Sequence, residues 1–507
     1  MAESFVLGID LGTGSCKTCL VDTSGRLRGR GSSDYRTHFP REGWAEQDPA
    51  DWLVAAVGSI RSVLTAAEVQ PHQIMGLSLT SAAHIGVLTD GRGEPVRRAI
   101  LWSDQRSAEQ IKRISKEVEE LIFASTRNKV STTWTLAHLL WIRDQEPREW
   151  ERAKRLLLSK DYLLNRLTGE SCTDRATAVS SMLYDTVAEA WSEQLCSLAG
   201  IDPRSLPAVR PAIHVAGGLL PEIAAETGLA AGLPVVNGTL DSATETYCAG
   251  AVASGDIVVR LGTAGGIHRV WDQARPFRQL ITYPYFVSSL WYAQAGTNSA
   301  GSAVAWSLQA LGGRSPLSNA ELTALAADVP PGSEGLLFHP YLAGERCPHW
   351  DERLRGSFTG FSMRHGPRHL ARAVLEGVCF SLKDAASLFG DLGPEQRTVR
   401  VVGGGTANPV WTRILCDVFS RPLAILRNAS SAYGTALLGL SALGAAIDPG
   451  AAAVRDSLEH DDLRPDPSNA RIYEAAFSRY RCVSGQLREL YRGSGTGATR
   501  TGGGGKA

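Results

Sequence analysis

Gly-Ile-Asp-Leu-Gly-Thr-Gly-Ser (residues 8–15) is the stretch that decides the fold, and a related phrase, Val-Arg-Leu-Gly-Thr-Ala-Gly, returns at residues 259–265. Each copy follows a run of apolar, strand-like residues and places a Gly-Thr pair at a sharp turn. Glycine lets backbone N–H groups approach an anion closely, and threonine adds a hydroxyl. Two such loops, one in each half of the chain, predict two related domains that hold a polyphosphate between them.

The two copies of the loop are not equivalent. The first contains an acid, Asp10, and the second has Arg260 in its place. An acid beside a phosphate loop is where a bridging Mg²⁺ finds an oxygen ligand. Because Mg²⁺ keeps much of its hydration shell, we expect Asp10 to hold it through water. The alternative is a buried aspartate that only accepts hydrogen bonds from the loop amides.

The composition is that of a large globular protein. For 507 residues, 43% of them hydrophobic, we expect two domains of more than about 200 residues or three smaller ones. Lys+Arg and Asp+Glu are equal at 52 each, which gives no support for binding to nucleic acid or to a membrane surface. No run approaches the roughly 18 consecutive apolar residues of a membrane span, and no signal peptide is evident.

The cysteines favour a cytoplasmic protein with reduced thiols. There are nine, an odd number, and they are scattered among apolar residues rather than arranged as a disulfide framework. Cys16 and Cys19 form a C-x-x-C, but residues three apart on a strand point to opposite faces. No second pair completes a four-cysteine zinc site, so a redox or metal role is the less favoured interpretation.

Short apolar runs alternate with longer helical patterns, which predicts an α/β fold. The clearest break in composition lies at residues 248–256. We therefore expect an N-terminal domain of residues 1–248, a C-terminal domain of residues 249–490 and a flexible Gly-rich tail of residues 491–507. The expected strands cover residues 5–11, 17–21, 74–79, 85–88, 233–236 and 399–402, and the expected helices cover residues 50–66 and 132–143. A further helix is expected after the glycine turn at residues 403–405, with Asn408 as its N-cap and Pro409 as its first residue.

Several motifs resemble one known family. Residues 10–17 look like the first phosphate loop of the FGGY family of carbohydrate kinases, and residues 356–361 with 369–376 fit its C-terminal signature at every constrained position. The resemblance runs from about residue 5 to about residue 490. It implies the two-domain actin-like ATPase (ribonuclease H-like) fold, with the active site in the interdomain cleft. Within the family, the stretches that resemble xylulokinases are residues 99–106, 160–162, 167–174 and 341–351.

The chain also departs from the patterns of the family. His138 stands where the family usually has Lys, and Ala264 replaces a common serine in the second loop. Ala429 lies in a stretch, residues 428–431, that lacks the glutamate often found there. Xylulokinases typically have Gln-Met before the pocket histidine, whereas this chain has Ala82 and Ala83.

The resemblance assigns roles to individual residues. Asp241, which follows an apolar strand and begins an apparent helix, aligns with the catalytic aspartate and is the expected general base; the alternative is an N-cap without chemistry. Asp10 is the expected metal ligand. The expected nucleotide-binding residues are Gly12, Thr13, Gly14, Ser15, Lys17, Gly262, Thr263, Gly404, Gly405, Thr406 and Asn408. The expected sugar-binding residues are His84, Trp102, Asp104 and Arg106.

The chain is thus expected to be an ATP- and Mg²⁺-dependent kinase for a small polyhydroxylated substrate, with D-xylulose first. Because the residues around His84 differ from the xylulokinase pattern, another ketose, a polyol or a cyclitol stays open as the acceptor. The hypothesis of another class is a non-catalytic actin-like ATPase switch. The expected partners are the sugar and ATP, without nucleic acid or membrane; a homodimer would agree with the family resemblance.

Overall fold

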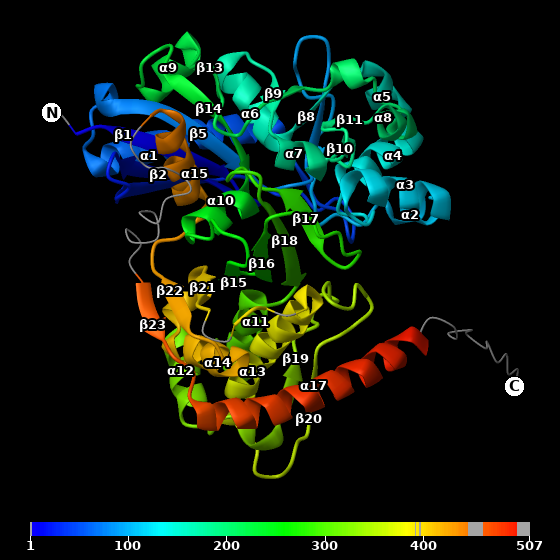
Figure 1. Cartoon of the computed structure of the whole chain (residues 1–507), viewed down its shortest axis with the longest axis vertical. Coiled ribbons are helices and arrows are strands. Elements are labelled where there is room, and N and C mark those ends of the chain that lie inside the picture. The colour runs from blue at the N-terminus through cyan, green and yellow to red at the C-terminus, as the bar shows by residue number, and fades with distance from the viewer. Residues whose placement is uncertain (1–2, 391, 395–396, 445–459, 494–507) are drawn as a thin grey trace, which may run out of the picture. The chain divides into compact units, whose positions relative to one another are not determined.

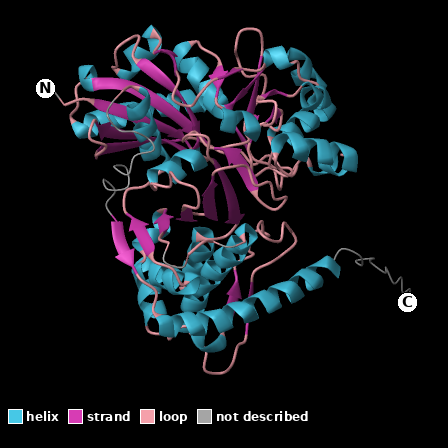
Figure 2. Cartoon of the chain, in the orientation of Figure 1, coloured by secondary structure: helices cyan, strands magenta, loops and turns pink. Residues whose placement is uncertain are grey.

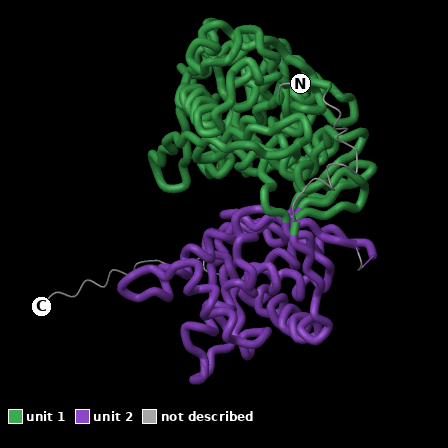
Figure 3. The backbone as a smooth tube through the Cα atoms, turned by 90° about the vertical axis from the view of Figure 1, so that its left-hand side faces the viewer, with its two compact units in different colours: residues 1–258, 268–294, 426–460 green, residues 259–267, 295–425, 461–507 purple. Residues whose placement is uncertain are grey.

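The computed structural model of the chain describes residues 3–390, 392–394, 397–444 and 460–493 (Figure 1). Helices and strands alternate along the chain, as the sequence predicts for an α/β protein (Figure 2). The chain divides into two compact units (Figure 3). Unit 1 comprises residues 1–258, 268–294 and 426–460, and unit 2 comprises residues 259–267, 295–425 and 461–507. The predicted boundary between residues 248 and 249 stays a prediction.

Unit 1 is built around a six-stranded sheet in the order β13-β14-β5-β1-β2-β3. The two innermost strands are almost completely buried, which is why their sequences are near-continuous apolar runs. β1 pairs in parallel with β5, and β5 pairs in parallel with β14. The strands are β1 (Phe5–Leu11), β2 (Ser15–Asp22), β3 (Leu27–Asp34), β5 (Ile74–Ser81), β13 (Val215–Gly218) and β14 (Pro234–Leu240).

Helices cover both faces of this sheet. α1 (Pro49–Ala67) packs on one face, where the Ser59 hydroxyl lies 2.7 Å from the Thr18 hydroxyl of β2. α15 (Ser431–Ala442) packs on the other face, so closely that a Cβ atom at Gly8 would lie 2.2 Å from the carbonyl oxygen of Ala432. By length and composition alone α1 also suits a membrane span, which is weak evidence, and its buried face is part of the core of unit 1.

A second sheet has seven strands in the order β17-β18-β16-β15-β21-β22-β23. Its strands are β15 (Ile257–Leu261), β16 (Gly265–Trp271), β17 (Ile281–Pro284), β18 (Trp291–Thr297), β21 (Val399–Val402), β22 (Leu423–Leu426) and β23 (His460–Leu463). The helices of unit 2 are α11 (Gly301–Leu311), α12 (Asn319–Ala327), α13 (Pro367–Ala386), α14 (Pro409–Phe419) and α17 (Pro467–Gly493). Unit 2 also contains β19 (Leu337–His339) and β20 (Ser357–Thr359).

Smaller elements complete unit 1. The short strands are β4 (Glu46–Gln47), β6 (Gly86–Thr89), β7 (Ala99–Ile100), β8 (Arg155–Leu158), β9 (Cys172–Thr173), β10 (Tyr184–Asp185), β11 (Ala190–Trp191) and β12 (Ala208–Val209). The remaining helices are α2 (Ala108–Lys112), α3 (Lys116–Thr126), α4 (Thr135–Gln145), α5 (Pro147–Arg152), α6 (Ser159–Thr168), α7 (Arg175–Ser180), α8 (Glu193–Ala199), α9 (Pro221–Thr227) and α10 (Asp241–Cys248).

The predicted elements are present, with shifted ends. The strands expected at residues 5–11 and 399–402 are confirmed at both ends. The helix expected at 132–143 begins only at Thr135, because a turn in which the Trp134 N–H donates to the Ser131 carbonyl precedes it. α17 continues to Gly493, so the prediction of a flexible tail from residue 491 is wrong for its first three residues. Residues 494–507 lie outside the described part of the chain.

The close approach of α15 to β1 predicts that Gly8→Ala destabilises the protein. The added methyl group meets backbone atoms of α15, which cannot move aside as a flexible side chain would. We expect a loss of about 1–3 kcal/mol of unfolding free energy or more, as for other overpacked cores. Urea unfolding measures it. Gly91→Ala, where the methyl group meets nothing within 4 Å, is the matched control, and equal stability of the two variants would contradict the packing argument.

Candidate active site

Two carboxylates lie at the same edge of the six-stranded sheet. Asp10 is opposite Thr80 in the parallel pairing of β1 and β5, and Thr80 is opposite Thr239 in the pairing of β5 and β14. Since neighbouring strands are about 4.8 Å apart, the backbones of Asp10 and Thr239 are separated by about 10 Å. Asp241 follows β14 directly, so unit 1 brings the expected metal ligand and the expected general base to one edge.

Asp241 is the first residue of α10 rather than its N-cap, which is Leu240. The interpretation of Asp241 as an N-cap is therefore wrong. Its side chain is half-buried, and the N–H of Ser242 donates to its Oδ1 over 2.7 Å. A backbone donor and the amino end of a helix both interact favourably with a carboxylate at this position.

A bulge in β14 aims Asp241. The register with β5 shifts between Val236 and Thr239, and Gly238 within this bulge has a φ angle of 75°. A Cβ atom there would lie 1.7 Å from the Leu79 carbonyl oxygen, so only glycine fits. The bulge is held from one side by Lys160, whose Nζ donates to the Asn237 carbonyl and to its side-chain oxygen over 3.1 and 2.9 Å.

Buried charges support this end of β14. Lys160 and Asp161 form an ion pair of 2.8 Å in which neither side chain is exposed. Burial raises the pKa of Asp161, and the neighbouring ammonium of Lys160 opposes that shift. The Thr239 hydroxyl donates to the Asp174 carboxylate over 2.7 Å, and the backbone carbonyl of Thr239 accepts from the Thr80 hydroxyl over 2.6 Å. These bonds fix the backbone two residues before Asp241.

The first phosphate loop is the turn between β1 and β2. Its Thr13 and Gly14 are exposed, and Lys17, also exposed, lies directly opposite Asp10 across the two strands. The indole N–H of Trp102 donates to the Thr13 hydroxyl over 3.3 Å. One predicted sugar-binding residue is therefore in contact with one predicted phosphate-binding residue.

His84 is held in a single orientation. It has a φ angle of 67°, uncommon for a residue other than glycine, and its side chain is buried. Its Nδ1 lies 3.2 Å from the Ser180 carbonyl, which can only accept, so this nitrogen carries the proton. The hydroxyl of Tyr283 then donates to Nε2 over 3.0 Å, and Trp134 packs edge-on against the ring.

Two tyrosines that the sequence did not indicate connect His84 with Asp241. Tyr283 packs on Tyr292 with ring centroids 5.6 Å apart, and the Tyr292 hydroxyl lies 2.9 Å from the Ser242 hydroxyl. Burial raises the pKa of both tyrosines well above the usual value, and the charge of Asp241 adds to the shift. Both remain protonated donors at neutral pH. Because they lie 42 and 51 residues beyond Asp241, in strands of the other sheet, no local sequence motif predicts them.

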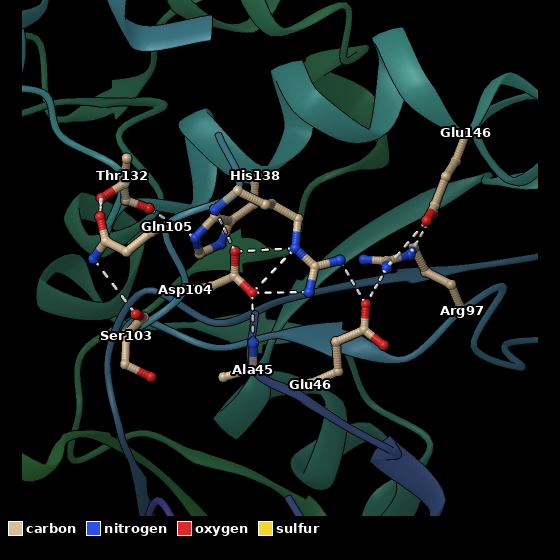
Figure 4. Close-up of polar contacts among 10 residues, drawn as sticks. Ala45, Glu46, Arg97, Ser103, Asp104, Gln105, Thr132, His138 and Glu146 are labelled. Atoms are coloured by element: carbon tan, nitrogen blue, oxygen red, sulfur yellow. Dashed lines mark hydrogen bonds and ion pairs between the residues drawn. The ribbon is translucent and has the colours of Figure 1, made fainter. Parts of the chain in front are cut away.

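Asp104 and Arg106, predicted to bind sugar hydroxyls, form an ion pair of 2.8 Å with each other. Figure 4 labels Asp104 within this network. Neither side chain is exposed. Asp104 accepts from the backbone N–H of Ala45 and from Arg106, which also pairs with Glu46 over 2.6 Å. Their contacts fix the segment that contains β4, and a direct role in binding sugar stays a prediction. His138, at the position where Lys is usual, lies beside this network and donates from Nε2 to the Thr132 carbonyl over 2.9 Å.

Unit 2 places the second phosphate loop beside the glycine turn. A Cβ atom at Gly403 would lie 2.6 Å from the carbonyl oxygen of Leu261, the residue before Gly262. The Asn408 side chain accepts from the backbone N–H groups of Val410 and Trp411, so it is the N-cap of α14, and Pro409 is the first helical residue, as predicted. With its oxygen engaged in this cap, Asn408 has only its amide nitrogen to offer a nucleotide.

Glu345 and Arg346, from the stretch that resembles xylulokinases, are buried and half-buried, respectively, in unit 2. Glu345 accepts from the Thr297 and Ser381 hydroxyls and from the Asn298 N–H. Burial raises its pKa to about 7, although these donors lower it. Burial also lowers the pKa of Arg346, near Arg260.

The described cysteines form no disulfide. All nine are free, and Cys16 and Cys19 are both buried on β2. Burial raises their pKa values to about 12 and 11, which suppresses the reactive thiolate. Across the part of the chain that the structure describes, no group of three or more His, Cys, Asp or Glu side chains is arranged for a metal ion.

The comparisons with known proteins agree with this geometry. Models of the N-terminal and C-terminal domains of the FGGY family of carbohydrate kinases match residues 5–248 and 257–443. The chain therefore belongs to the FGGY family of carbohydrate kinases, which phosphorylate sugars with ATP, and it has the predicted two-domain actin-like fold.

The individual proteins that the chain resembles include sugar kinases and a gluconokinase. The chain is 32% identical to a xylulose kinase of Lactococcus lactis, over 96% of this chain and 98% of the relative. It is 30% identical to a gluconokinase of Bacillus licheniformis, over 87% and 88%. The solved structure of a xylulose kinase from Rhodospirillum rubrum, 30% identical, superposes with a TM-score of 0.86 over 96% of this chain and 100% of that one.

His138 makes the stability of the protein depend on pH. Burial lowers its pKa to about 4, below the value of about 6.5 in an unfolded chain. Between these values the unfolded state binds a proton that the folded state does not, so the unfolding free energy falls as pH is lowered from 6.5 towards 4.

Replacement of His138 by Gln removes this titration and keeps a donor for Thr132. The pH dependence of the variant should be shallower by at most about 1.4 kcal/mol per pH unit in that window. Urea unfolding at pH 7, 6 and 5 measures the difference. His339 and His349, whose pKa values burial also lowers to about 4, are unchanged in both proteins and cancel. Parallel profiles would contradict the assignment.

Proposed function

We propose that this protein transfers the γ-phosphoryl group of Mg²⁺-ATP to a hydroxyl of a small sugar, most specifically D-xylulose to D-xylulose 5-phosphate, with Asp241 as the general base. The observation that carries the proposal is the common edge of the sheet in unit 1. There Asp10, beside the first phosphate loop, and Asp241, aimed by the bulge at Gly238, are about two strands apart.

Asp241 would accept the proton of the attacking hydroxyl. A sugar hydroxyl is a poor nucleophile, and a positioned carboxylate removes its proton as the oxygen attacks phosphorus. The new O–P bond forms while the bond between the γ-phosphorus and the bridging oxygen breaks, and ADP leaves with that electron pair. The Ser242 N–H, bonded to Oδ1, would hold the carboxylate in place as it takes up this proton.

Asp10 is the residue that would hold Mg²⁺. The ion usually binds proteins through one or two carboxylates and completes its shell with waters and substrate phosphates. A single buried carboxylate next to a turn in which Thr13 and Gly14 are exposed is such a donor set. When bound, the ion would neutralise charge on the phosphates.

The remaining residues would bind the two substrates. In unit 1, Thr13, Ser15 and Lys17 would meet the phosphates, and Trp102 would lie along the carbon chain of the sugar. In unit 2, the backbone N–H groups of the second phosphate loop would bind phosphate, and the turn at residues 403–406 would take the adenosine. His84 would orient the acceptor site through its bond with Tyr283.

D-Xylulose is proposed as the acceptor because relatives over nearly the full chain bear the name xylulose kinase. Two observations keep the alternative of another ketose, polyol or cyclitol. Gluconokinases are also about 30% identical to this chain. In addition, Ala82 and Ala83 supply no polar group beside His84.

Asp241→Asn tests the general base. The amide keeps the size of the side chain but cannot take up the proton, so we expect kcat to fall by about 100-fold or more, with nucleotide binding retained. Coupled ADP-release kinetics and calorimetric titration with an ATP analogue measure the two quantities. Asp272→Asn, at an exposed position, controls for loss of one negative charge. Full transfer activity in Asp241→Asn would refute the assignment.

A substrate screen separates the candidate functions. ADP release is measured with pentuloses, hexuloses, gluconate, polyols and cyclitols, and we expect the highest kcat/KM with D-xylulose. A higher value with another compound would replace D-xylulose as the acceptor and leave the class intact. No stimulation by any of them would favour the hypothesis of an ATPase switch.

A further inference from the structure

We infer that Tyr35 and Gln47 are positioning residues that orient the first phosphate loop, so that its backbone N–H groups face the nucleotide phosphates. The inference rests on the proposed function, because it assumes that the first phosphate loop binds the phosphates of ATP. It assigns a task to two residues outside the predicted site. Both residues follow β3, in a segment that closes on itself where His38 and Glu46 exchange backbone hydrogen bonds of 2.8 and 2.9 Å.

Three consecutive carbonyl groups of the loop accept hydrogen bonds from this one segment. The Tyr35 hydroxyl donates to the Gly12 carbonyl. The Gln47 side-chain amide donates to the Thr13 carbonyl over 2.5 Å, and the Tyr35 backbone N–H donates to the Gly14 carbonyl over 3.3 Å. The three carbonyl oxygens of the loop are thus bound by donors of this one segment.

Peptide geometry determines where the donors point. In a trans peptide unit the carbonyl of one residue and the N–H of the next are antiparallel. With the carbonyls of residues 12–14 drawn towards Tyr35 and Gln47, the N–H groups of Thr13, Gly14 and Ser15 face the opposite side, where Thr13 and Gly14 are exposed. Successive N–H groups that face one side form an anion-binding concavity.

The Gln47 side chain is fixed at both ends. Its oxygen accepts from the indole N–H of Trp52 over 3.1 Å, and its nitrogen donates to Thr37 as well as to the loop. The assignment of oxygen and nitrogen follows from these partners, because an indole N–H can only donate. The adjacent Glu46 is paired with Arg97 and Arg106 in the buried network of Figure 4.

The second phosphate loop shows a similar arrangement, in which the donors are backbone N–H groups and the hydroxyl of Ser302, which donates to the Thr263 carbonyl over 3.1 Å. The Gly262 carbonyl accepts from the Gly301 N–H over 2.8 Å, and the Thr263 carbonyl accepts from the N–H groups of Ala300 and Ser302 over 3.1 and 3.0 Å. The N–H groups of Thr263 and Ala264 are therefore turned away from α11. In this arrangement the donors are oriented without a side-chain contact from residue 264, where this chain has alanine.

Gln47→Glu tests the inference. The variant has the same shape, but a carboxylate oxygen would face the Thr13 carbonyl where an N–H donated, and two acceptors repel. We expect about tenfold or weaker binding of Mg²⁺ with a non-hydrolysable ATP analogue, since hydrogen bonds to charged groups are the strong ones. Binding of AMP, which lacks the β- and γ-phosphates, should change less than twofold. Tyr35→Phe removes only the hydrogen bond to the Gly12 carbonyl. It should weaken binding of the ATP analogue by less than Gln47→Glu does, again with little change in binding of AMP.

Calorimetric titration of the full chain provides both affinities without reliance on turnover. Gln70→Glu, at an exposed position, controls for the added negative charge. The inference is overturned if Gln47→Glu and Tyr35→Phe bind the ATP analogue as tightly as wild type does, or if their affinities for AMP and for the analogue fall equally. The proposed function stands in either case. If the wild-type protein does not bind the analogue, the proposed function and the inference fail together.

Discussion

The parallel pairing of β1, β5 and β14 is the constraint on which the rest of the structure depends. Parallel strands bring their carboxyl ends to one edge of a sheet, and ligands bind outside that edge. Asp10 and Asp241 are 231 positions apart in the chain, yet the shared register of Thr80 and Thr239 brings them within about two strand spacings. A shift of one residue would turn Asp10 to the other face of the sheet.

Buried charge makes that edge rigid. Lys160 with Asp161, and Arg106 with Asp104, are ion pairs whose side chains are not exposed. Such pairs add little net stability, because desolvation offsets their attraction, but loss of one partner leaves a buried charge uncompensated. Their value here is position, since one pair holds the bulge before Asp241 and the other fixes the segment that contains Gln47.

The two phosphate loops share a short Gly-Thr motif and a similar pattern of hydrogen bonds. Each loop has its carbonyls bound on one side, so each presents its N–H groups on the other. The first loop has Asp10 and Ser15 where the second has Arg260 and Gly265, and both keep a threonine, Thr13 and Thr263. The two loops therefore differ in their side chains.

The sequence by itself determined the family, the α/β class, the strand at each phosphate loop, the cap at Asn408 and the candidates Asp10 and Asp241. These features are local: a strand, a glycine turn or a cap needs only the residues within a few positions, and short apolar runs show the period of the element. Even the N-terminal strand of residues 5–11 could be placed at both ends, because all seven of its residues are buried.

Only the tertiary structure decided which polar side chains pair with one another. Asp104 and Arg106 form an ion pair inside the protein, and their predicted role in binding sugar stays a prediction. No sequence pattern indicated Tyr35, Gln47 or Tyr283. In the structure, Tyr35 and Gln47 donate hydrogen bonds to the first phosphate loop, and Tyr283 donates to His84. The physical reason is that a buried polar group must find its partner wherever the fold supplies one, and that choice depends on contacts between residues far apart in the chain, which no local pattern records.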